Sequence, residues 1–514
     1  MSEQKLDPIE RRWILGALML TMFLAAMDST IIATAVPQIA ADLGGFAWIG
    51  WVFSIYLLLQ MVCIPIYGKL ADLHGRKPIL VFGTSVFLLG SACCALAWNM
   101  PSLIVFRGLQ GLGAGAIMAT VATLVGDLFT VRERAAIQGW LSSVWGVAAI
   151  VGPTLGGAFV EYASWRWIFL INLPLGAVAL FLVSRFLHEQ VERREHRIDF
   201  TGAALILLGS GALFFGLLEG GQAWPWRSWQ SLLSFVPAIV LLFAAWRVER
   251  RAAEPTMPAW LWRRRNLALS NLAMVGLGIV LMAPNTYLPT FGQSALGLDA
   301  IAAGLLLATI SLGWPLASSW SGRLYLSIGF RNTALIGAVL ALLATLAFAL
   351  LPEPQSVPVL IGVHALLGAG FGLMSTPLLV ALQSAVGWSE RGVVTSANMF
   401  SRYLGMSLGA VLVGALFNHA MRKALDKAPG KAGSPWPSDL DAVIRALHDT
   451  ATPHAVADYL REAMVTATVH VYAGVAVAAL LTLLAISGIR RDFARHSDRV
   501  ENAAVTGEAV DGPH

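Results

Sequence analysis

The sequence predicts an all-α polytopic membrane protein with fourteen membrane-spanning helices, arranged as two related six-helix halves and an inserted pair. Three observations lead to this prediction. Of the 514 residues, 57% are hydrophobic and 13% are charged, whereas soluble domains average about 25% charged residues. Fourteen apolar segments are long enough to cross a bilayer, which takes about 20 helical residues. Motifs in the first part of the chain recur in the last part at a nearly constant offset.

The apolar segments follow one another along nearly the whole chain. Runs of this length with few charges are typical of transmembrane helices. Their approximate bounds are 13–36, 48–68, 79–98, 101–126, 136–160, 167–187, 200–219, 230–248, 267–290, 301–321, 333–351, 357–386, 393–418 and 465–488.

Basic side chains are distributed unevenly between the loops. If the N-terminus is cytoplasmic, the cytoplasmic loops contain most of the arginines and lysines, and the alternate short loops contain chiefly Arg166 and Arg227. This is the positive-inside pattern, and an even number of spans returns the C-terminus to the cytoplasm. The net charge of +5 is therefore a topology signal, and nucleic acid is not an expected partner.

One external loop, at about 420–464, is long and carries six basic and six acidic side chains. Long loops are translocated regardless of charge, so this loop is consistent with the topology. Two stretches of it, 439–447 and 455–464, are candidates for short surface helices. The polar tail at 491–514 is predicted to be a disordered cytoplasmic segment.

An internal repeat relates the two halves. Gly68-Lys69-Leu70 recurs as Gly322-Arg323-Leu324, at an offset of 254. At an offset of 257, Arg107 and the glycines that follow it correspond to His364 and its glycines; these are Gly111, Gly113 and Gly115 in the first half and Gly368, Gly370 and Gly372 in the second. Because six spans need about 190 residues, the excess of about 60 matches the pair of spans at 200–248. The predicted organisation is a first half at 1–190, an inserted pair at 191–265, a second half at 266–490 and the tail.

Asp28 is the only charged residue within the first apolar segment, near mid-depth. A charge at the bilayer centre costs at least about 2.5–3.5 kcal/mol on insertion scales. We therefore expect Asp28 to face a water-filled, protein-lined space, to be protonated, or both. Our hypothesis is that Asp28 binds a proton or a cationic substrate, with Thr30 as a nearby cavity residue. The corresponding region of the second half, around Met282, has no acid, and no other span has a mid-depth carboxylate.

Arg107 lies too deep in the fourth span to be an ordinary interfacial anchor. A cation there needs a carboxylate, water or backbone oxygens. One interpretation is that Arg107 modulates proton binding by a nearby acid, with Asp28 as the candidate. The other is that it snorkels to the external headgroups. Gln110, one helical turn later, is a further candidate for the cavity.

The loop between the second and third spans reads Gly68-Lys69-Leu70-Ala71-Asp72-Leu73-His74-Gly75-Arg76-Lys77. Glycines at both ends permit a tight turn and a close backbone approach, and Asp72 can pair with an arginine or with a helix N-terminus. The cluster, with Gly68, Asp72, Gly75, Arg76 and Lys77 as its key residues, is predicted to be a conformational latch between the halves. The alternative is a basic loop that only sets topology.

The fifth span contains the motif Gly152-Pro153-Thr154-Leu155-Gly156-Gly157. Pro153 lacks a backbone N–H and should loosen or kink the helix. Gly152 and Gly156 form a small-residue face for close packing, and Gly157 follows directly. We expect this helix to seal a pathway and act as a pivot, against the alternative of ordinary close packing.

Weaker candidates lie in the second half. Asn285 and Tyr287 can line a cavity, because Pro284 and Pro289 suggest a kinked or locally unwound helix. His364, which corresponds to Arg107, is either a second titrating group or a satisfied buried histidine.

These motifs together resemble those of the major facilitator superfamily, and in particular its branch of fourteen-span drug:proton antiporters. The resemblance covers essentially the full chain. It includes Met27-Asp28-Ser29-Thr30 with Val36-Pro37, the loop at 68–77, the Arg107 motif, the fifth-span motif and the stretch at 165–176. This chain departs from the branch at Ala148, where a glycine is usual.

The resemblance implies a major facilitator fold and proton-coupled export of hydrophobic or cationic small molecules by alternating access, with Asp28 and Arg107 as functional charges. It implies a multi-pass protein of the bacterial inner or plasma membrane, in contact with membrane lipid. The proton gradient would be the energy source, without a cofactor or a metal. Some relatives in double-membrane bacteria work with a periplasmic adaptor and an outer-membrane duct, which leaves such partners open, and the loop at 420–464 is where they would bind.

Two other functions are alternatives. One is an exporter or permease for a single metabolite or antibiotic, without obligatory proton coupling; the exporter-type fifth-span motif argues against uptake. The other is a membrane enzyme or a sensor. No Walker phosphate loop, nucleophile elbow or metal-spaced histidine cluster is present in the sequence, so an enzyme is not expected.

Overall fold

The computed structural model describes residues 8–44, 48–189, 199–221, 224–252, 254–350, 356–428, 436–437, 443, 446–447 and 452–491. Regular structure among these residues is helical, apart from one isolated bridge between Gly220 and Trp224. The predicted tail after Arg491, and most of the candidate surface helix at 439–447, lie outside the described residues.

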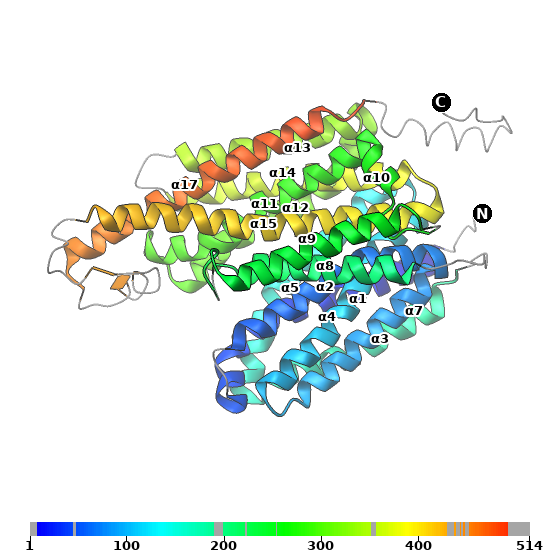
Figure 1. The fold of residues 1–514 in the computed structure, drawn as a ribbon, viewed down its shortest axis with the longest axis horizontal. Helices are drawn as coiled ribbons and strands as arrows, with labels where there is room; N and C mark the ends of the chain where they lie inside the picture. The colour runs from blue at the N-terminus through cyan, green and yellow to red at the C-terminus, as the bar shows by residue number, and fades with distance from the viewer. Residues whose placement is uncertain are drawn as a thin grey trace. The chain divides into compact units, whose positions relative to one another are not determined.

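The helices follow the apolar segments along the chain (Figure 1). The first part contains α1 (Pro8–Leu43), α2 (Ile49–His74), α3 (Arg76–Ala95), α4 (Met100–Leu128), α5 (Val131–Tyr162), α6 (Trp167–Leu170) and α7 (Asn172–Phe186). The inserted part contains α8 (Phe200–Glu219), α9 (Trp229–Glu249) and α10 (Ala259–Arg263). The last part contains α11 (Arg265–Ser294), α12 (Ala300–Ile328), α13 (Phe330–Leu350), α14 (Val357–Ser384), the 3₁₀ turn η2 (Trp388–Glu390), α15 (Arg391–Asp426) and α17 (His454–Ser487).

Fourteen spans in the described residues are long and apolar enough to cross a membrane, as predicted. Helices α6 and α7 together form one of them, Trp167–Phe186, and η2 with α15 forms another, Trp388–Asp426. The stretch 455–464, expected to be a separate surface helix, is instead the first part of α17. Its buried Ala457, Leu460 and Met464 continue the buried face of the membrane-spanning part at helical spacing, so the helix does not break.

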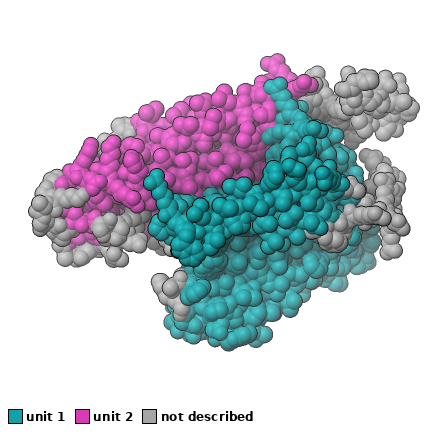
Figure 2. Space-filling model, in the orientation of Figure 1, with its two compact units in different colours: residues 1–268, 379–400, 492–514 teal, residues 269–378, 401–491 magenta. Residues whose placement is uncertain are grey.

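Two compact units divide the described helices (Figure 2). Unit 1 contains the residues described up to Ala268, together with 379–400. Unit 2 contains 269–378 and 401–491. The inserted helices α8 and α9 thus belong to unit 1, as do the end of α14 and the beginning of α15.

Helix α4 is the central helix of unit 1, with 83% of its apolar window buried, and it packs against α2 and α3. Its glycines allow the backbones to touch. A Cβ added at Gly111 would lie 2.4 Å from the carbonyl oxygen of Tyr56, and one at Gly113 would lie 2.4 Å from the amide nitrogen of Phe87. Real Cβ atoms do not approach this closely, so the packing of α4 requires these glycines.

Unit 2 repeats this packing around α14. A Cβ at Gly368 would lie 2.4 Å from the carbonyl oxygen of Ile310 on α12, and one at Gly370 would lie 2.8 Å from the amide nitrogen of Ala341 on α13. Tyr56 and Ile310 also correspond at the offset of 254. The repeat inferred from the glycine pattern is therefore confirmed in the helix contacts.

Candidate functional site

Asp28 lies inside unit 1, in the middle of α1, and is fully buried. Its carboxylate receives hydrogen bonds from three side chains. Arg107 Nη1 lies 2.5 Å from Oδ2, Gln110 Nε2 lies 2.7 Å from Oδ1, and Asn172 Nδ2 lies 3.2 Å from Oδ1. All three donors are also buried. The contacts use Asp28 solely as an acceptor, and they join α1 to α4 and α7.

Arg107 is turned inward to this carboxylate and is about 1% exposed. Its Nη1 also donates to Gln110 Oε1 at 2.7 Å, and its Nε donates to the carbonyl oxygen of Val52 at 3.2 Å. The guanidinium carbon lies 4.2 Å from the centre of the Tyr56 ring, a cation–π contact. A buried charge needs a counter-ion and hydrogen bonds, and Arg107 has both, because Asp28 provides the charge.

Two residues of this network were missed from the sequence. Asn172, at the break between α6 and α7, donates to Ser91 Oγ at 2.9 Å as well as to Asp28. Ser91 on α3 also accepts from Gln110 at 3.2 Å and donates to the carbonyl oxygen of Phe169 at 3.0 Å. The only signal in the sequence was an amide side chain within an otherwise apolar span.

Thr30 lies at the crossing of α1 and α5. Its hydroxyl donates to the carbonyl oxygen of Ala148 at 2.9 Å. A Cβ at Gly152 would lie 2.1 Å from Thr30 Oγ1, and one at Gly156 would lie 2.2 Å from Thr34 Oγ1. The two glycines therefore allow α5 to pack directly on the threonines of α1.

The other two residues of the fifth-span motif have different surroundings. Pro153 lies within α5, which runs on to Tyr162 without ending at the proline. A Cβ added at Gly157 would meet nothing within 4 Å. Packing therefore explains Gly152 and Gly156 but not Gly157.

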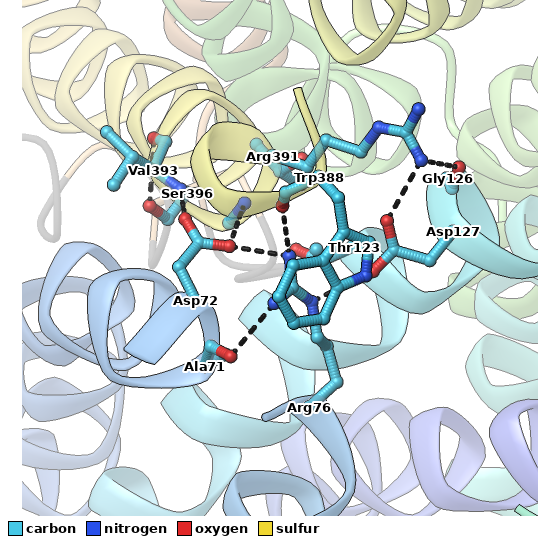
Figure 3. A network of polar contacts seen from close by, with 12 residues as sticks. Ala71, Asp72, Arg76, Thr123, Gly126, Asp127, Trp388, Arg391, Val393 and Ser396 are labelled. Carbon is cyan, nitrogen blue, oxygen red and sulfur yellow. Dashed lines mark hydrogen bonds and ion pairs between the residues drawn. The ribbon is translucent and has the colours of Figure 1, made fainter. Parts of the chain in front are cut away.

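Asp72, at the end of α2, holds the beginning of α15 (Figure 3). Its Oδ1 accepts from the backbone N–H of Gly392 and its Oδ2 from that of Val393, both at 2.9 Å. Arg76 Nη2 donates to the same carboxylate at 2.6 Å. The free N–H groups of a first helical turn form a natural site for an anion, and here Asp72 fills it.

Arg76 and Asp127 extend this contact into a chain of charges (Figure 3). Arg76 Nε lies 2.8 Å from Asp127 Oδ2, and Arg391 Nη1 lies 3.0 Å from Asp127 Oδ1. Arg76 Nη2 donates to the carbonyl oxygen of Trp388 at 2.6 Å, and its guanidinium lies 3.7 Å from the centre of that indole ring. Two carboxylates and two guanidinium groups thus balance one another, although Arg76 is fully buried.

Glycines make this contact between backbones possible. A Cβ at Gly68 would lie 2.2 Å from Ser396 Oγ and 2.6 Å from the carbonyl oxygen of Gly392. Gly75, which separates α2 from α3, has φ of 96°, a conformation that side-chain-bearing residues rarely adopt. The glycines expected from the sequence to permit a close approach and a tight turn lie where α2 meets α15 and where α2 turns into α3.

A remote carboxylate caps the helix that follows. Glu189 accepts from the backbone N–H of Arg76 at 2.9 Å and of Lys77 at 2.8 Å, the first turn of α3. Lys77 Nζ donates to the carbonyl oxygen of Ser184 at 2.9 Å. The segment after α7 is therefore fastened to the start of α3, and sequence reasoning did not identify Glu189.

His364 lies in unit 2 and is fully buried. Its Nδ1 is 2.8 Å from the carbonyl oxygen of Leu360, and its Nε2 is 2.7 Å from the hydroxyl of Tyr472. A carbonyl oxygen can only accept, so Nδ1 carries the proton and Nε2 accepts from Tyr472. Phe348 stacks on Tyr472 at 3.7 Å between ring centres. Both ring nitrogens are satisfied, with no acid or base among these partners.

Asn285 and Tyr287 point to different surroundings within unit 2. Tyr287 is buried and stacks on Phe417 at 4.3 Å between ring centres, whereas Asn285 is exposed. The two prolines were expected to give a kinked or locally unwound helix, and α11 continues through Pro284 and Pro289 to its end without unwinding. In the described part of the chain, no three His, Cys, Asp or Glu side chains are grouped as metal ligands.

Comparison with known proteins gives matches along most of the chain. A family model described as Major Facilitator Superfamily matches residues 18–410. The chain is 34% identical to "Multidrug transporter protein MdtP" of Bacillus subtilis (strain 168) over 409 residues, which are 80% of this chain and 76% of that protein. It is 32% identical to "Multidrug resistance protein 3" of the same strain over 469 residues, 90% of this chain and 91% of that protein.

Solved structures show the same fold. The human organic anion transporter MFSD10 (TETRAN) matches with a TM-score of 0.61 at 15% identity, over 93% of this chain and 100% of that chain. A bacterial homologue of the iron transporter ferroportin matches with a TM-score of 0.59 at 14% identity, over 92% of this chain and 98% of that chain.

Proposed function

Because the chain belongs to the Major Facilitator Superfamily and is a multi-pass membrane transporter, we propose that it exports hydrophobic or cationic small molecules in exchange for protons. Two relatives that share about a third of its sequence are described as multidrug proteins, which supports the substrate class. We place both termini in the cytoplasm on the basis of the arginine distribution. The two Bacillus relatives support a bacterial plasma or inner membrane.

The observation that carries the proposal is the buried Asp28 with Arg107 as its counter-ion. Asp28 is fully buried, and the largely buried carboxylates of Asp72 and Asp127 are both engaged with the start of α15. Ionisable residues within membrane spans are expensive, and they mark ion and substrate pathways. Asp28 is therefore the best candidate for the proton-coupling group.

The network suggests how proton binding changes helix packing. A proton on Asp28 adds an O–H donor among Arg107, Gln110 and Asn172, which all donate to it. The neutral acid no longer balances Arg107, so the contacts that join α1 to α4 and α7 weaken. Repacking of these helices would couple protonation to alternating access, and a cationic substrate can replace the proton as the partner of Asp28.

We propose that the contact of Asp72 with α15 is a latch that opens and closes during this cycle. The carboxylate holds the first turn of α15 through two backbone N–H groups, and Arg76 holds it through Trp388. Charge-assisted hydrogen bonds of this kind are stronger than neutral ones, yet each can be exchanged for water at a helix end. An Asp72→Asn variant is expected to lower the transport rate while leaving substrate binding in place.

Reconstitution tests the coupling directly. Purified protein in liposomes with a trapped pH-sensitive dye is given tetraphenylphosphonium as the probe substrate, and proton movement is followed. Asp28→Asn is expected to abolish substrate-driven proton movement. The matched control is Glu161→Gln, which removes an exposed carboxylate at the end of α5 and should behave as wild type.

Unchanged proton movement in Asp28→Asn would exclude Asp28 as the coupling group. The direction of probe transport in inverted vesicles under a pH gradient separates export from uptake. A wild-type protein that moves one compound only, and without protons, would support the alternative of a specific, uncoupled permease.

A further inference from the structure

We propose that unit 1 carries a binding site for an anionic phospholipid, formed by the end of α9 and the loop that follows it. Six arginines lie within this short region, and we call them the arginine cluster. They are Arg247, Arg250, Arg251, Arg263, Arg264 and Arg265. All six are exposed. The ligand chemistry is a lipid phosphate with its acyl chains, and three features of the region support it.

The first feature is charge without a partner in the protein. Several other basic side chains of unit 1 have acceptors; Arg11, for example, is paired with Glu133. In the cluster, only Arg264 approaches an acid, at 4.0 Å from Glu390. The other five side chains make no ion pair or hydrogen bond with the residues that the structure describes, and their positive charge is available to a phosphate.

The two acids within this region are already engaged. Glu249 accepts from the backbone N–H groups of Thr256 and Met257, at 2.7 and 2.8 Å. Glu254 is paired with Lys69 Nζ at 2.5 Å. Neither carboxylate is free to neutralise the cluster, and both bonds hold the loop in one arrangement.

The second feature is an apolar surface that leads to the cluster. Large apolar side chains on one face of α9 are each more than half exposed, and we call them the α9 stripe. They are Leu232, Leu233, Val236, Ile239, Val240 and Phe243. Their three- and four-residue spacing places them in one line along the helix. In a membrane-spanning helix this line faces lipid tails, and it ends at the cluster.

The third feature is an aromatic boundary between stripe and cluster. Trp246 and Trp262 are 47% and 48% exposed, and tryptophan is enriched at the level of the lipid headgroups. The Arg250 guanidinium lies 4.7 Å from the centre of the Trp246 ring. Buried Leu261 anchors the short helix α10 that carries Trp262. The arginines are thus held at headgroup depth, where basic clusters bind anionic lipids.

The lipid site is connected to the latch. Lys69 lies near the end of α2, directly after Gly68, and its ion pair with Glu254 fastens the lipid-facing loop to that end of the helix. Occupancy by lipid should therefore favour the arrangement in which Asp72 holds α15. This consequence rests on the proposed transport function, whereas lipid binding does not.

Native mass spectrometry of the full chain in detergent tests binding without any transport assay. Phosphatidylglycerol is expected to bind more tightly than phosphatidylcholine. Arg250→Gln/Arg251→Gln should weaken phosphatidylglycerol binding about thirtyfold, at roughly 1 kcal/mol for each arginine. The control Arg422→Gln/Lys423→Gln removes the same charge from exposed positions of α15 and should leave affinity unchanged. The variant Arg250→Lys/Arg251→Lys, which keeps both charges, should retain most of the wild-type affinity for phosphatidylglycerol.

Equal affinity for the two lipids, or an equal loss in the control variant, would overturn the proposal. Displacement of the lipid by millimolar inorganic phosphate would also overturn it, because the acyl chains would then contribute nothing. In a second arm, probe transport is compared in liposomes with and without phosphatidylglycerol. Glu254→Gln leaves all six arginines in place, so it is expected to bind phosphatidylglycerol but to lose the stimulation of transport by this lipid. If wild type transports nothing, the proposed function fails while the binding result still stands.

Discussion

Arg107 on α4 and His364 on α14 occupy corresponding positions of the two halves, and both are buried in a helix with the same glycine pattern. Their surroundings differ completely. Arg107 is bound to Asp28 and to the amide oxygen of Gln110. His364 has a backbone carbonyl on one ring nitrogen and the hydroxyl of Tyr472 on the other, within stacked aromatic rings.

The comparison shows which features both halves share and which feature only one half has. The glycines that bring backbones together are the same in both halves, since they determine how the helices cross. At this position the charge is present in one half only, and a buried ion pair is expensive to desolvate. We infer that the first half carries the ion chemistry and that the polar group of α14 serves packing.

Breaking the Asp28–Arg107 pair should give the largest effect. Arg107→Gln leaves Asp28 without its counter-ion, and breaking one side of a buried pair costs about 3–5 kcal/mol. Reversible unfolding in mixed micelles should show this loss, and the double variant Asp28→Asn/Arg107→Gln should regain part of it. Substrate-driven proton movement should be lost in both the single and the double variant. A loss below about 1 kcal/mol in the single variant would mean that the pair is not a unit.

The next largest effect is expected from a methyl group added at the helix crossings that both halves share. The cost in stability should be equal in the two halves. Gly113→Ala and Gly370→Ala place a methyl group against backbone atoms of α3 and α13, and such overpacking costs about 1–3 kcal/mol. Unfolding measurements on both variants check the prediction. A large cost in one half and none in the other would show that the repeat does not extend to packing energies.

Removing the Tyr472 hydroxyl should cost less and leave coupling intact. Tyr472→Phe leaves His364 Nε2 without its donor, at about 1–2 kcal/mol for an unsatisfied buried acceptor. Substrate-driven proton movement should be as in wild type, both here and in the double variant His364→Phe/Tyr472→Phe. If the double variant lost proton movement, α14 would take part in the ion chemistry and the contrast with α4 would fail.

The smallest effect is expected at Gly157 and at Gly414, its counterpart in the second half. No atom lies within 4 Å of an added Cβ at either position. Replacing glycine by alanine in a helix stabilises it by roughly 0.5–1 kcal/mol. Both variants should therefore unfold at a slightly higher denaturant concentration than wild type. Normal stability with lost transport in Gly157→Ala alone would assign that glycine to another state of the cycle.

Much of the fold follows from local signals in the sequence. Apolar length determined the number of spans, and the spacing of Gly111, Gly113 and Gly115 indicated close helix crossings. The pairing of Asp28 with Arg107 was also accessible, because two isolated charges within membrane spans need each other. In each case the constraint acts on one kind of residue at a given depth in the membrane. It can be recognised in the sequence without knowing which residues pack around it.

The neutral members of the site could not be predicted in the same way. Asn172 and Ser91 are ordinary residues in helices, and only the crossing of α3, α4 and α7 brings them to Gln110. Thr30 was expected in a cavity but donates to a carbonyl of α5, since the glycines of that helix admit it. Glu189 caps α3 from 112 or more positions away. Such contacts depend on long-range geometry.

The contact between Asp72 and Gly392 has a consequence for biosynthesis. The two residues are 320 positions apart, and ribosomes add about 5–20 residues per second. Unit 1 therefore lacks its last segment for roughly 16–64 seconds after Asp72 is made. During that time Asp72, at the end of α2, can pair with Arg76, the first residue of α3. The nascent first half is therefore without the α15 partners of Asp72 until the segment at 379–400 is made.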